Sequence, residues 1–202
     1  MTKFRLAIVA AAFALLAAVG IFSGYRSLRH PVTTSQIDPS VHIGGPFVLI
    51  DQDGRKVTDA ALRDRWTAVF FGYTYCPNIC PLTLQNLAQT QKRLGGKGKD
   101  LQILFITVDP ARDTPGQLKS YLASNGFPVG VKGLSGSPAE IAAVEKAYRA
   151  TPKRYLQDGT YYFSHTAVVY LMDPEGRFNA PLTADMSPEE NAAQIEQAMR
   201  GD

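Results

Sequence analysis

The first half of this chain alternates between apolar runs and polar turns in a way that predicts strands around a helix. The segments 47–50 and 55–58 flank Asp51-Gln52-Asp53-Gly54, which predicts a β-hairpin with a glycine-containing turn. The continuous apolar runs 67–73 and 101–108 predict two buried central strands. Between these runs, the spacing of four leucines predicts a helix that ends at Gly95-Gly96; they are Leu82, Leu84, Leu87 and Leu94.

Three later helices are predicted from one repeated start signal. Each has a hydroxyl residue at the N-cap, proline at the first helical position and Gln or Glu at the third; the N-caps are Thr114, Ser137 and Ser187. Two pairs of β-prone segments flank Gly-containing turns: 154–156 with 160–163, and 167–172 with 178–182. The order is a hairpin, then βαβα, another helix, antiparallel strands and a closing helix. It predicts a single α/β domain over 44–202, with a mixed sheet flanked by helices.

The N-terminus carries a membrane signal. Leu6 to Phe22 is a run of 17 residues without a charged side chain, about 26 Å long as a helix. Residues 1–25 are therefore expected to form an uncleaved transmembrane anchor, with a cleaved signal peptide as the alternative, and 26–43 a linker. The flanking cations slightly favour an orientation with the N-terminus inside and the rest of the chain outside. No Arg- and Ser-rich leader of the kind that directs import into organelles precedes the run. These features predict a single-pass protein of the bacterial inner membrane with its domain in the periplasm.

Charge excludes one class of function. The formal net charge is +3, but four of the basic groups lie in the first 30 residues, and without them 17 basic groups face 18 acidic ones. A nucleic-acid-binding domain needs a basic face, so nucleic acid is not an expected partner.

Candidate chemistry centres on the only two cysteines. Cys76 and Cys80 follow the apolar run 67–73, at the carboxyl end of a central strand where α/β sheets place ligands. Asn78 is positioned to cap the next helix, and the helix dipole there favours a thiolate at Cys80. If the turn is helical, a spacing of four places both sulfurs on one side of it, within reach of a disulfide. Two buried structural cysteines, or a short structural disulfide, are the alternative.

The histidines decide which metal the dithiol suits. His30 and His42 fall in the predicted linker and are expected to be solvated, whereas His165 precedes an apolar strand. Two thiolates suit Cu(I), and an imidazole completes a trigonal site that also tolerates Cu(II). Zinc needs a fourth ligand that no further cysteine supplies. His165 is therefore the leading third ligand, although a structural role is the alternative.

Three separated motifs resemble the Sco/SenC family of cytochrome c oxidase assembly proteins. They are FFGYTYCPNICPLTLQNLAQ, VDPARDTP and SHTAVVYLMDPEGRF, in the family's order. The resemblance implies a thioredoxin-like fold with an extra N-terminal hairpin, preceded by one transmembrane helix. It also implies copper bound by Cys76, Cys80 and His165. Family members often have Asp before the histidine, and Ser164 stands there in this chain, which affects the expected tuning of the imidazole.

The resemblance implies a metallochaperone and not an enzyme. It would take copper from a periplasmic donor and deliver it to the copper-centre subunit of cytochrome c oxidase. A membrane-anchored thiol–disulfide reductase that keeps the subunit's cysteines reduced is the alternative, with Cys76 and Cys80 as its redox disulfide. Against it, no proline occurs between Pro152 and Pro174 to supply the cis-proline of thioredoxin-like reductases. A peroxiredoxin-type peroxidase is a weaker alternative, because no catalytic Cys with Thr and Arg partners stands out.

Other notable residues have structural interpretations. Asp109 and Asp113 are expected to serve the turn before a capped helix, with the alternative that Asp109 or Arg112 shapes the copper loop or a partner surface. Met172 and Met186 are expected in the core. Four tyrosines are expected in the core or on a hairpin face, although an exposed one near Cys76 would suit docking; they are Tyr73, Tyr75, Tyr161 and Tyr162.

Overall fold

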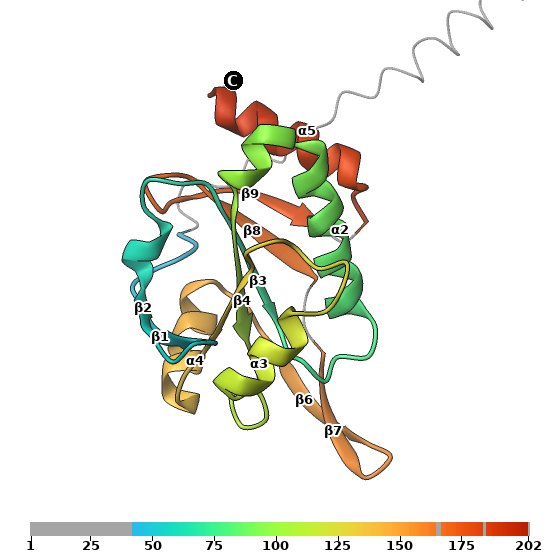
Figure 1. The fold of residues 1–202 in the computed structure, drawn as a ribbon. Coiled ribbons are helices and arrows are strands. Elements are labelled where there is room, and N and C mark those ends of the chain that lie inside the picture. Colours follow the sequence, from blue (N-terminus) through green and yellow to red (C-terminus); the bar gives the residue numbers. More distant parts are fainter. Residues whose placement is uncertain (1–41, 165–166, 184, 202) are drawn as a thin grey trace, which may run out of the picture. The chain divides into compact units, whose positions relative to one another are not determined.

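The structure, a computed structural model, describes residues 42–164, 167–183 and 185–201. In these residues seven strands form one mixed sheet in the order β2-β1-β5-β4-β3-β8-β9, while β6 and β7 form a separate hairpin (Figure 1). The strands are β1 (Val48–Asp51), β2 (Lys56–Thr58), β3 (Thr67–Gly72), β4 (Gln102–Thr107), β5 (Lys132–Ser135), β6 (Lys153–Gln157), β7 (Thr160–Ser164), β8 (Val168–Met172) and β9 (Phe178–Thr183). The helices are α2 (Ile79–Arg93), α3 (Pro115–Leu122), α4 (Pro138–Ala147) and α5 (Pro188–Arg200), with 3-10 turns η1 (Asp59–Leu62) and η2 (Gly95–Lys99).

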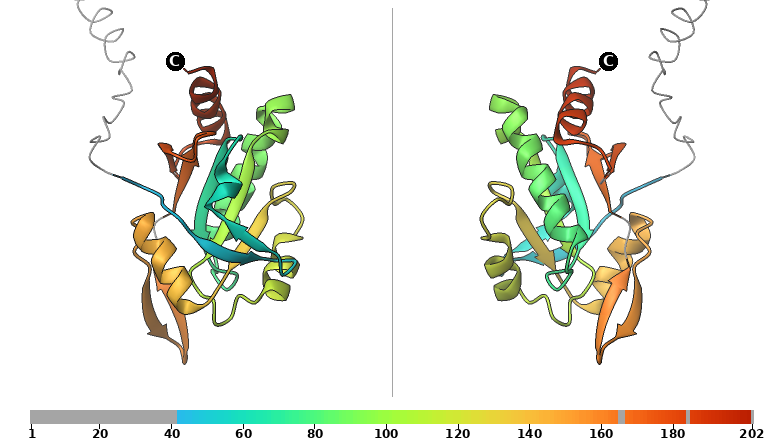
Figure 2. Two further views of the ribbon diagram at one scale, coloured as in Figure 1. Left: turned by 90° about the vertical axis from the view of Figure 1, so that its left-hand side faces the viewer. Right: turned by 90° about the vertical axis from the view of Figure 1, so that its right-hand side faces the viewer.

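Three parallel strands form the centre of the sheet. β4 pairs in parallel with both β3 and β5, and antiparallel strands β8 and β1 continue the sheet on either side. The chain crosses from β3 to β4 to β5 in one direction, so two right-handed crossovers place α2 and α3 on the same face. Figure 2 shows α4 on the other side of the sheet. All six residues of β3 are buried, as expected of a strand covered on both faces.

The predicted helix starts and the first hairpin are confirmed. The side chains of Thr114, Ser137 and Ser187 each accept a hydrogen bond from the backbone N–H three residues later. Ser137 and Ser187 also form complete capping boxes with Glu140 and Glu190. β1 and β2 pair as the expected antiparallel hairpin.

One strand was missing from the prediction. β5 has only four residues and contains Gly133, which weakens a strand signal. Packing favours glycine at this position: a Cβ there would lie 2.6 Å from Cδ1 of Leu122 and 3.1 Å from Cβ of Leu118, both on α3. Of the four leucines that predicted the preceding helix, Leu84, Leu87 and Leu94 are buried, whereas Leu82 is 60% exposed.

The predicted anchor, residues 1–25, and nearly all of the predicted linker, 26–43, lie outside the described residues. Within the ranges that the structure describes, no helix is long and apolar enough to cross a membrane.

Candidate metal centre

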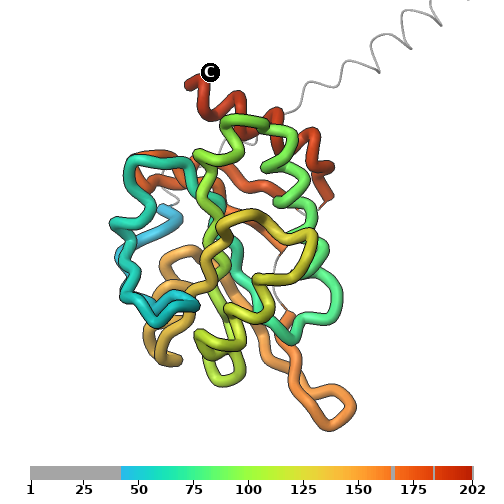
Figure 3. Tube along the Cα trace, in the orientation of Figure 1, coloured from blue at the N-terminus to red at the C-terminus, as the bar shows by residue number. Residues whose placement is uncertain are grey.

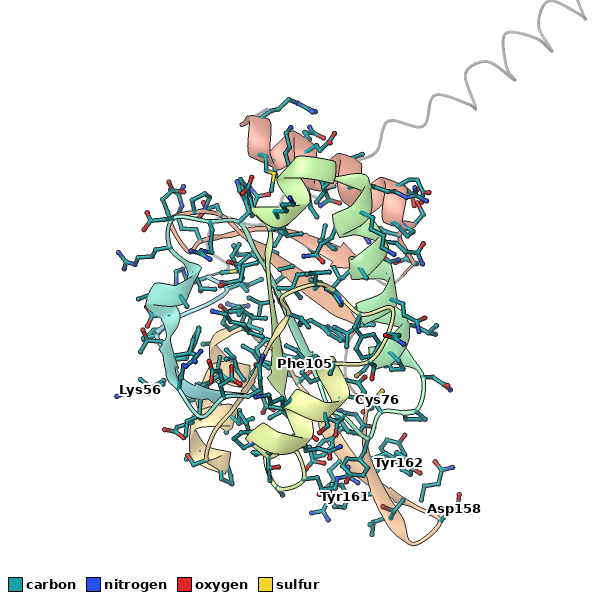
Figure 4. The ribbon with its side chains drawn as sticks, viewed as in Figure 1. Lys56, Cys76, Phe105, Asp158, Tyr161 and Tyr162 are labelled. Atoms are coloured by element: carbon teal, nitrogen blue, oxygen red, sulfur yellow. The ribbon has the colours of Figure 1, made fainter. Side chains whose placement is uncertain are left out.

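The two cysteines lie where β3 gives way to α2. Cys76 is in the connecting loop and Cys80 is the second residue of the helix, while Asp109 and Asp113 follow the adjacent parallel strand β4. Parallel strands end at one edge of a sheet, so both loops meet there. The hairpin β6–β7 reaches the same end of the domain, as the chain path in Figure 3 shows; Figure 4 labels Tyr161 and Tyr162 on the hairpin and Cys76 in the loop.

The two cysteines lie close together, although only Cys80 is part of α2 and Cys76 precedes the helix. Both cysteines are thiols, and the Cys80 backbone N–H donates to Cys76 Sγ with a donor–acceptor distance of 3.5 Å. Cys76 is 8% exposed and Cys80 is fully buried. The pair is therefore a compact, soft donor set whose approach from solvent is through Cys76.

The helix terminus was expected to favour a thiolate at Cys80, but burial of the sulfur opposes this effect. Burial, followed by the interaction with Cys76, raises the pKa of the Cys80 thiol far above its usual value. Desolvation disfavours the charged sulfur more than the helix terminus favours it. Asn78 also fails to cap α2 with its side chain; instead its carbonyl accepts the Leu82 N–H. A soft cation would offset this cost, because metal binding needs the deprotonated sulfur.

Gly72, the last residue of β3, makes room for the dithiol. A Cβ at this position would lie 2.8 Å from Cys80 Sγ and 2.7 Å from a ring carbon of Phe105. Real contacts are not that short, so a side chain at position 72 would displace the sulfur or the ring.

A buried carboxylate holds the loop that leads to Cys76. Asp113 accepts hydrogen bonds from the Thr74 N–H at 3.0 Å, from the Thr74 hydroxyl at 2.7 Å and from the Thr107 hydroxyl. Gln117 on α3 adds a bond from its side-chain amide to the Thr74 hydroxyl. Burial raises the pKa of Asp113, although the three donors lower it. Asp113 thus does more than the turn role expected of it: it ties the cysteine loop to the end of β4.

Tyr73 joins the same loop to β7. Its hydroxyl donates to the Phe163 carbonyl and accepts from the Phe163 N–H, and the two rings pack edge to face. Tyr73 is buried, as expected. His165, the predicted third ligand, lies outside the described residues. The chain two residues before it is nevertheless held against the start of the cysteine loop.

The guanidinium of Arg112 lies between the cysteine loop and β7. Arg112 Nε is bound to the buried carboxylate of Asp109, which also accepts from the Tyr161 hydroxyl at 3.1 Å. The Arg112 guanidinium carbon lies 3.8 Å from the ring centroid of Tyr161 on β7 and 4.6 Å from that of Tyr75, the neighbour of Cys76. The alternative role considered for Asp109 and Arg112, shaping the cysteine loop, thus has direct contacts behind it.

The remaining candidates have simpler positions. His42 is exposed; His30 lies outside the described ranges. Met172 is in the core, as expected, and Met186 is half-buried. Tyr75 is 49% exposed, and Tyr161 and Tyr162 are half-buried, so of the four tyrosines only Tyr73 is a core residue.

No cluster of three or more metal-binding side chains occurs among the described residues, so the site has two placed donors there. A groove of about 760 Å³ lies at the amino ends of β3 and β4, away from the dithiol; Trp66, Gln102 and Phe127 line part of it.

Comparison with known proteins places this geometry in a family. Residues 35–200 match the family described as SCO1/SenC. The chain is 43% identical over 138 residues to the mitochondrial "SCO1 homolog 1" of Arabidopsis thaliana, covering 67% of this chain and 41% of the relative. It is 34% identical over 192 residues to "Protein SenC" of Rhodobacter capsulatus, covering 92% and 86%. The chain thus spans less than half of the mitochondrial relative but most of the bacterial one.

Solved structures agree with the sequence comparison. ScoI of Bradyrhizobium japonicum with copper bound superimposes with a TM-score of 0.71 at 45% identity, covering 77% of this chain and 98% of that one. BsSco, described with a disulfide switch and as a member of the Sco family of cytochrome c oxidase assembly proteins, gives a TM-score of 0.65 at 26% identity, covering 82% and 96%. The expected thioredoxin-like mixed α/β fold is therefore confirmed, as is the N-terminal hairpin.

Proposed function

The chain belongs to the SCO1/SenC family, and on that premise we propose that it is a copper-binding metallochaperone for cytochrome c oxidase. It binds copper through Cys76, Cys80 and His165 and delivers the ion to the copper-centre subunit of the oxidase. The observation that carries the proposal is the dithiol at the junction of the cysteine loop and α2, beside the point where Tyr73 holds the strand leading to His165. Copper-bound relatives of the same fold support the choice of metal.

The residues present fit copper as a cargo. The two sulfurs, which lie four residues apart at the start of α2, suit the linear or trigonal coordination that Cu(I) prefers. An imidazole extends the site to Cu(II). Binding releases the thiol protons, which makes copper uptake depend on pH and on the reduced state of both cysteines. The partial exposure of Cys76 leaves one ligand open to exchange with an acceptor.

A transfer experiment tests the proposal. Copper-loaded protein is mixed with the reduced, copper-free soluble domain of the oxidase subunit, and the absorption of the acceptor's copper centre is followed. We expect the centre to form, and Cys76→Ser to abolish its formation. A wild-type protein that binds copper tightly but never yields it to the acceptor contradicts delivery.

A thiol–disulfide reductase is the second candidate, favoured by the unequal burial of the cysteines. The Cys76 thiolate attacks an acceptor disulfide, one acceptor thiolate leaves and takes a proton, and Cys80 then closes the Cys76–Cys80 disulfide and releases the second thiol. Two electrons pass to the acceptor, and a small-molecule or protein thiol must restore the dithiol. Copper-free protein that reduces an oxidised acceptor faster than free dithiol supports this role.

The location follows from the N-terminal sequence. Residues 1–25 anchor the chain in a bacterial inner membrane, and the domain faces the periplasm, where it meets a copper donor and the oxidase. The apolar run from Leu6 to Phe22 supports this placement. Carbonate washing should leave the full-length chain in the membrane fraction, whereas its release contradicts an anchor.

A further inference from the structure

Arg112 is placed unusually for a residue that serves stability alone. Its side chain is only 20% exposed, and its Nη2 atom is buried without a hydrogen-bond partner among the described residues. A buried donor of a charged group that stays unsatisfied opposes folding. Because this unsatisfied donor lowers stability, we expect Arg112 to have a role besides stabilising the fold.

The contacts of Arg112 join three segments. Its Nε is bound to Asp109, in the loop after β4. Its guanidinium plane lies against Tyr161 on β7 and against Tyr75 in the cysteine loop. Asp109 also accepts a hydrogen bond from the Tyr161 hydroxyl, so that Arg112, Asp109 and Tyr161 are all in contact with one another. One cation thus connects the loop that carries Cys76 with the strand that leads to His165.

We propose that Arg112 is a positioning residue for the copper site, which sets the register between the Cys76 loop and β7. The inference rests on the proposed function and names a residue that determines how well the third ligand meets the dithiol. A guanidinium is suited to this role because it is flat, stacks on aromatic faces and keeps its charge. Residues beyond the ligands that orient them alter metal affinity by about tenfold to a hundredfold.

Arg154 supplies a matched control. Its guanidinium carbon lies 4.1 Å from the centroid of the same Tyr161 ring, but its residue is exposed and it has no contact with Asp109 or Tyr75 in the structure described. Arg112→Lys and Arg154→Lys therefore make the same chemical change over one ring. Only the first removes the link to the cysteine loop, and its ammonium keeps a charge beside Asp109, so the fold is retained.

The test compares wild type, Arg112→Lys and Arg154→Lys as full-length chains in detergent. Cu(I) and Cu(II) affinities are measured by competition with chelators, and Cu(II) by electron paramagnetic resonance. We expect Arg112→Lys to weaken Cu(II) binding by about tenfold or more and to change its spectrum. Cu(I), which two thiolates satisfy, should change little, and Arg154→Lys should resemble wild type in both states.

A metal-free readout accompanies the titration. In copper-free Arg112→Lys the Phe163 amide should exchange its hydrogen faster than in Arg154→Lys, because β7 is held less firmly. Unchanged Cu(II) affinity and spectrum in Arg112→Lys, or an equal loss in Arg154→Lys, overturns the positioning role. Absence of copper binding in the wild type would instead refute the proposed function.

Discussion

Tyr73 and Phe163 are joined by two hydrogen bonds across 90 residues of sequence: the tyrosine hydroxyl donates to the Phe163 carbonyl at 3.3 Å and accepts from its N–H at 3.2 Å. Tyr73 lies three residues before Cys76, and Phe163 lies two before His165. The Tyr73 side chain thereby directly connects the two segments that carry the proposed ligands. Because the ring is buried, the joint is shielded from competing water.

Tyr73→Phe tests this joint. The variant keeps the ring and leaves the Phe163 N–H and carbonyl without the hydroxyl, which should lower the free energy of unfolding by about 1–3 kcal/mol. Exchange of the Phe163 amide should accelerate. Tyr155→Phe is the control, because Tyr155 is largely exposed and should behave as wild type. Equal stability and equal exchange in both variants would show that the hydroxyl bridge is unimportant.

Gly72→Ala should disturb the dithiol without replacing a ligand. The added Cβ overlaps Cys80 Sγ and Phe105, so we expect a loss of about 1–3 kcal/mol in urea denaturation. Gly116→Ala on α3 is the control, since nothing lies within 4 Å of its Cβ position. That substitution should be neutral or stabilise by up to about 1 kcal/mol. Two variants of equal stability would contradict the close packing behind Cys80.

Asp113→Ala should loosen the loop before Cys76. Three donors from Thr74 and Thr107 lose their acceptor, which should cost about 3 kcal/mol or more, since buried donors left unpaired are expensive. Alkylation of Cys76 should accelerate as the loop opens. Asp53→Ala, which removes an exposed ion pair with Lys119, should cost at most about 1 kcal/mol. If Cys76 reacts at the wild-type rate in Asp113→Ala, the carboxylate does not hold the loop.

Two glutamates on α4 should give opposite pH dependences. Burial raises the pKa of Glu145 to about 7, so the stability linked to it is full below its usual pKa of 4.5 and is lost as the pH rises through 7. Glu145→Gln should therefore raise the Tm at pH 8 and change little at pH 4. The bonds from Ser137 lower the pKa of Glu140, so its contribution is present above pH 4.5 and is lost as the pH falls below it. Glu140→Gln should lower the Tm at pH 7 and less at pH 3; matching pH profiles for the two variants would contradict both assignments.

Local signals explain what the sequence predicted well. The caps at Thr114, Ser137 and Ser187 depend on residues three positions apart, and the two cysteines are only four positions apart. Such patterns are visible without the fold. The continuous apolar runs at 67–73 and 101–108 predicted the central strands, because a strand that is covered on both faces carries apolar residues throughout.

Tertiary contacts explain what it could not predict. Nothing in VDPARDTP shows that Asp113 will accept bonds from Thr74, 39 residues earlier, or that Arg112 will lie over Tyr161. The helix terminus was expected to favour a thiolate at Cys80, but the burial that raises the pKa of this thiol depends on the tertiary fold. β5 was missed because it contains Gly133, a residue that suits the close packing of this strand against α3 but has a low strand propensity.

The central claim is that Cys76, Cys80 and His165 together hold copper, and titration of the reduced full-length chain and its His165→Ala variant with Cu(I) and Cu(II) tests it most directly. Two thiolates still satisfy Cu(I), whereas Cu(II) favours nitrogen ligands and higher coordination. We predict that the variant keeps its fold and Cu(I), loses Cu(II) affinity and the wild-type Cu(II) spectrum, and that oxidising Cys76 and Cys80 abolishes binding of both ions. Unchanged Cu(II) affinity and spectrum in His165→Ala would contradict the three-ligand site and favour the reductase.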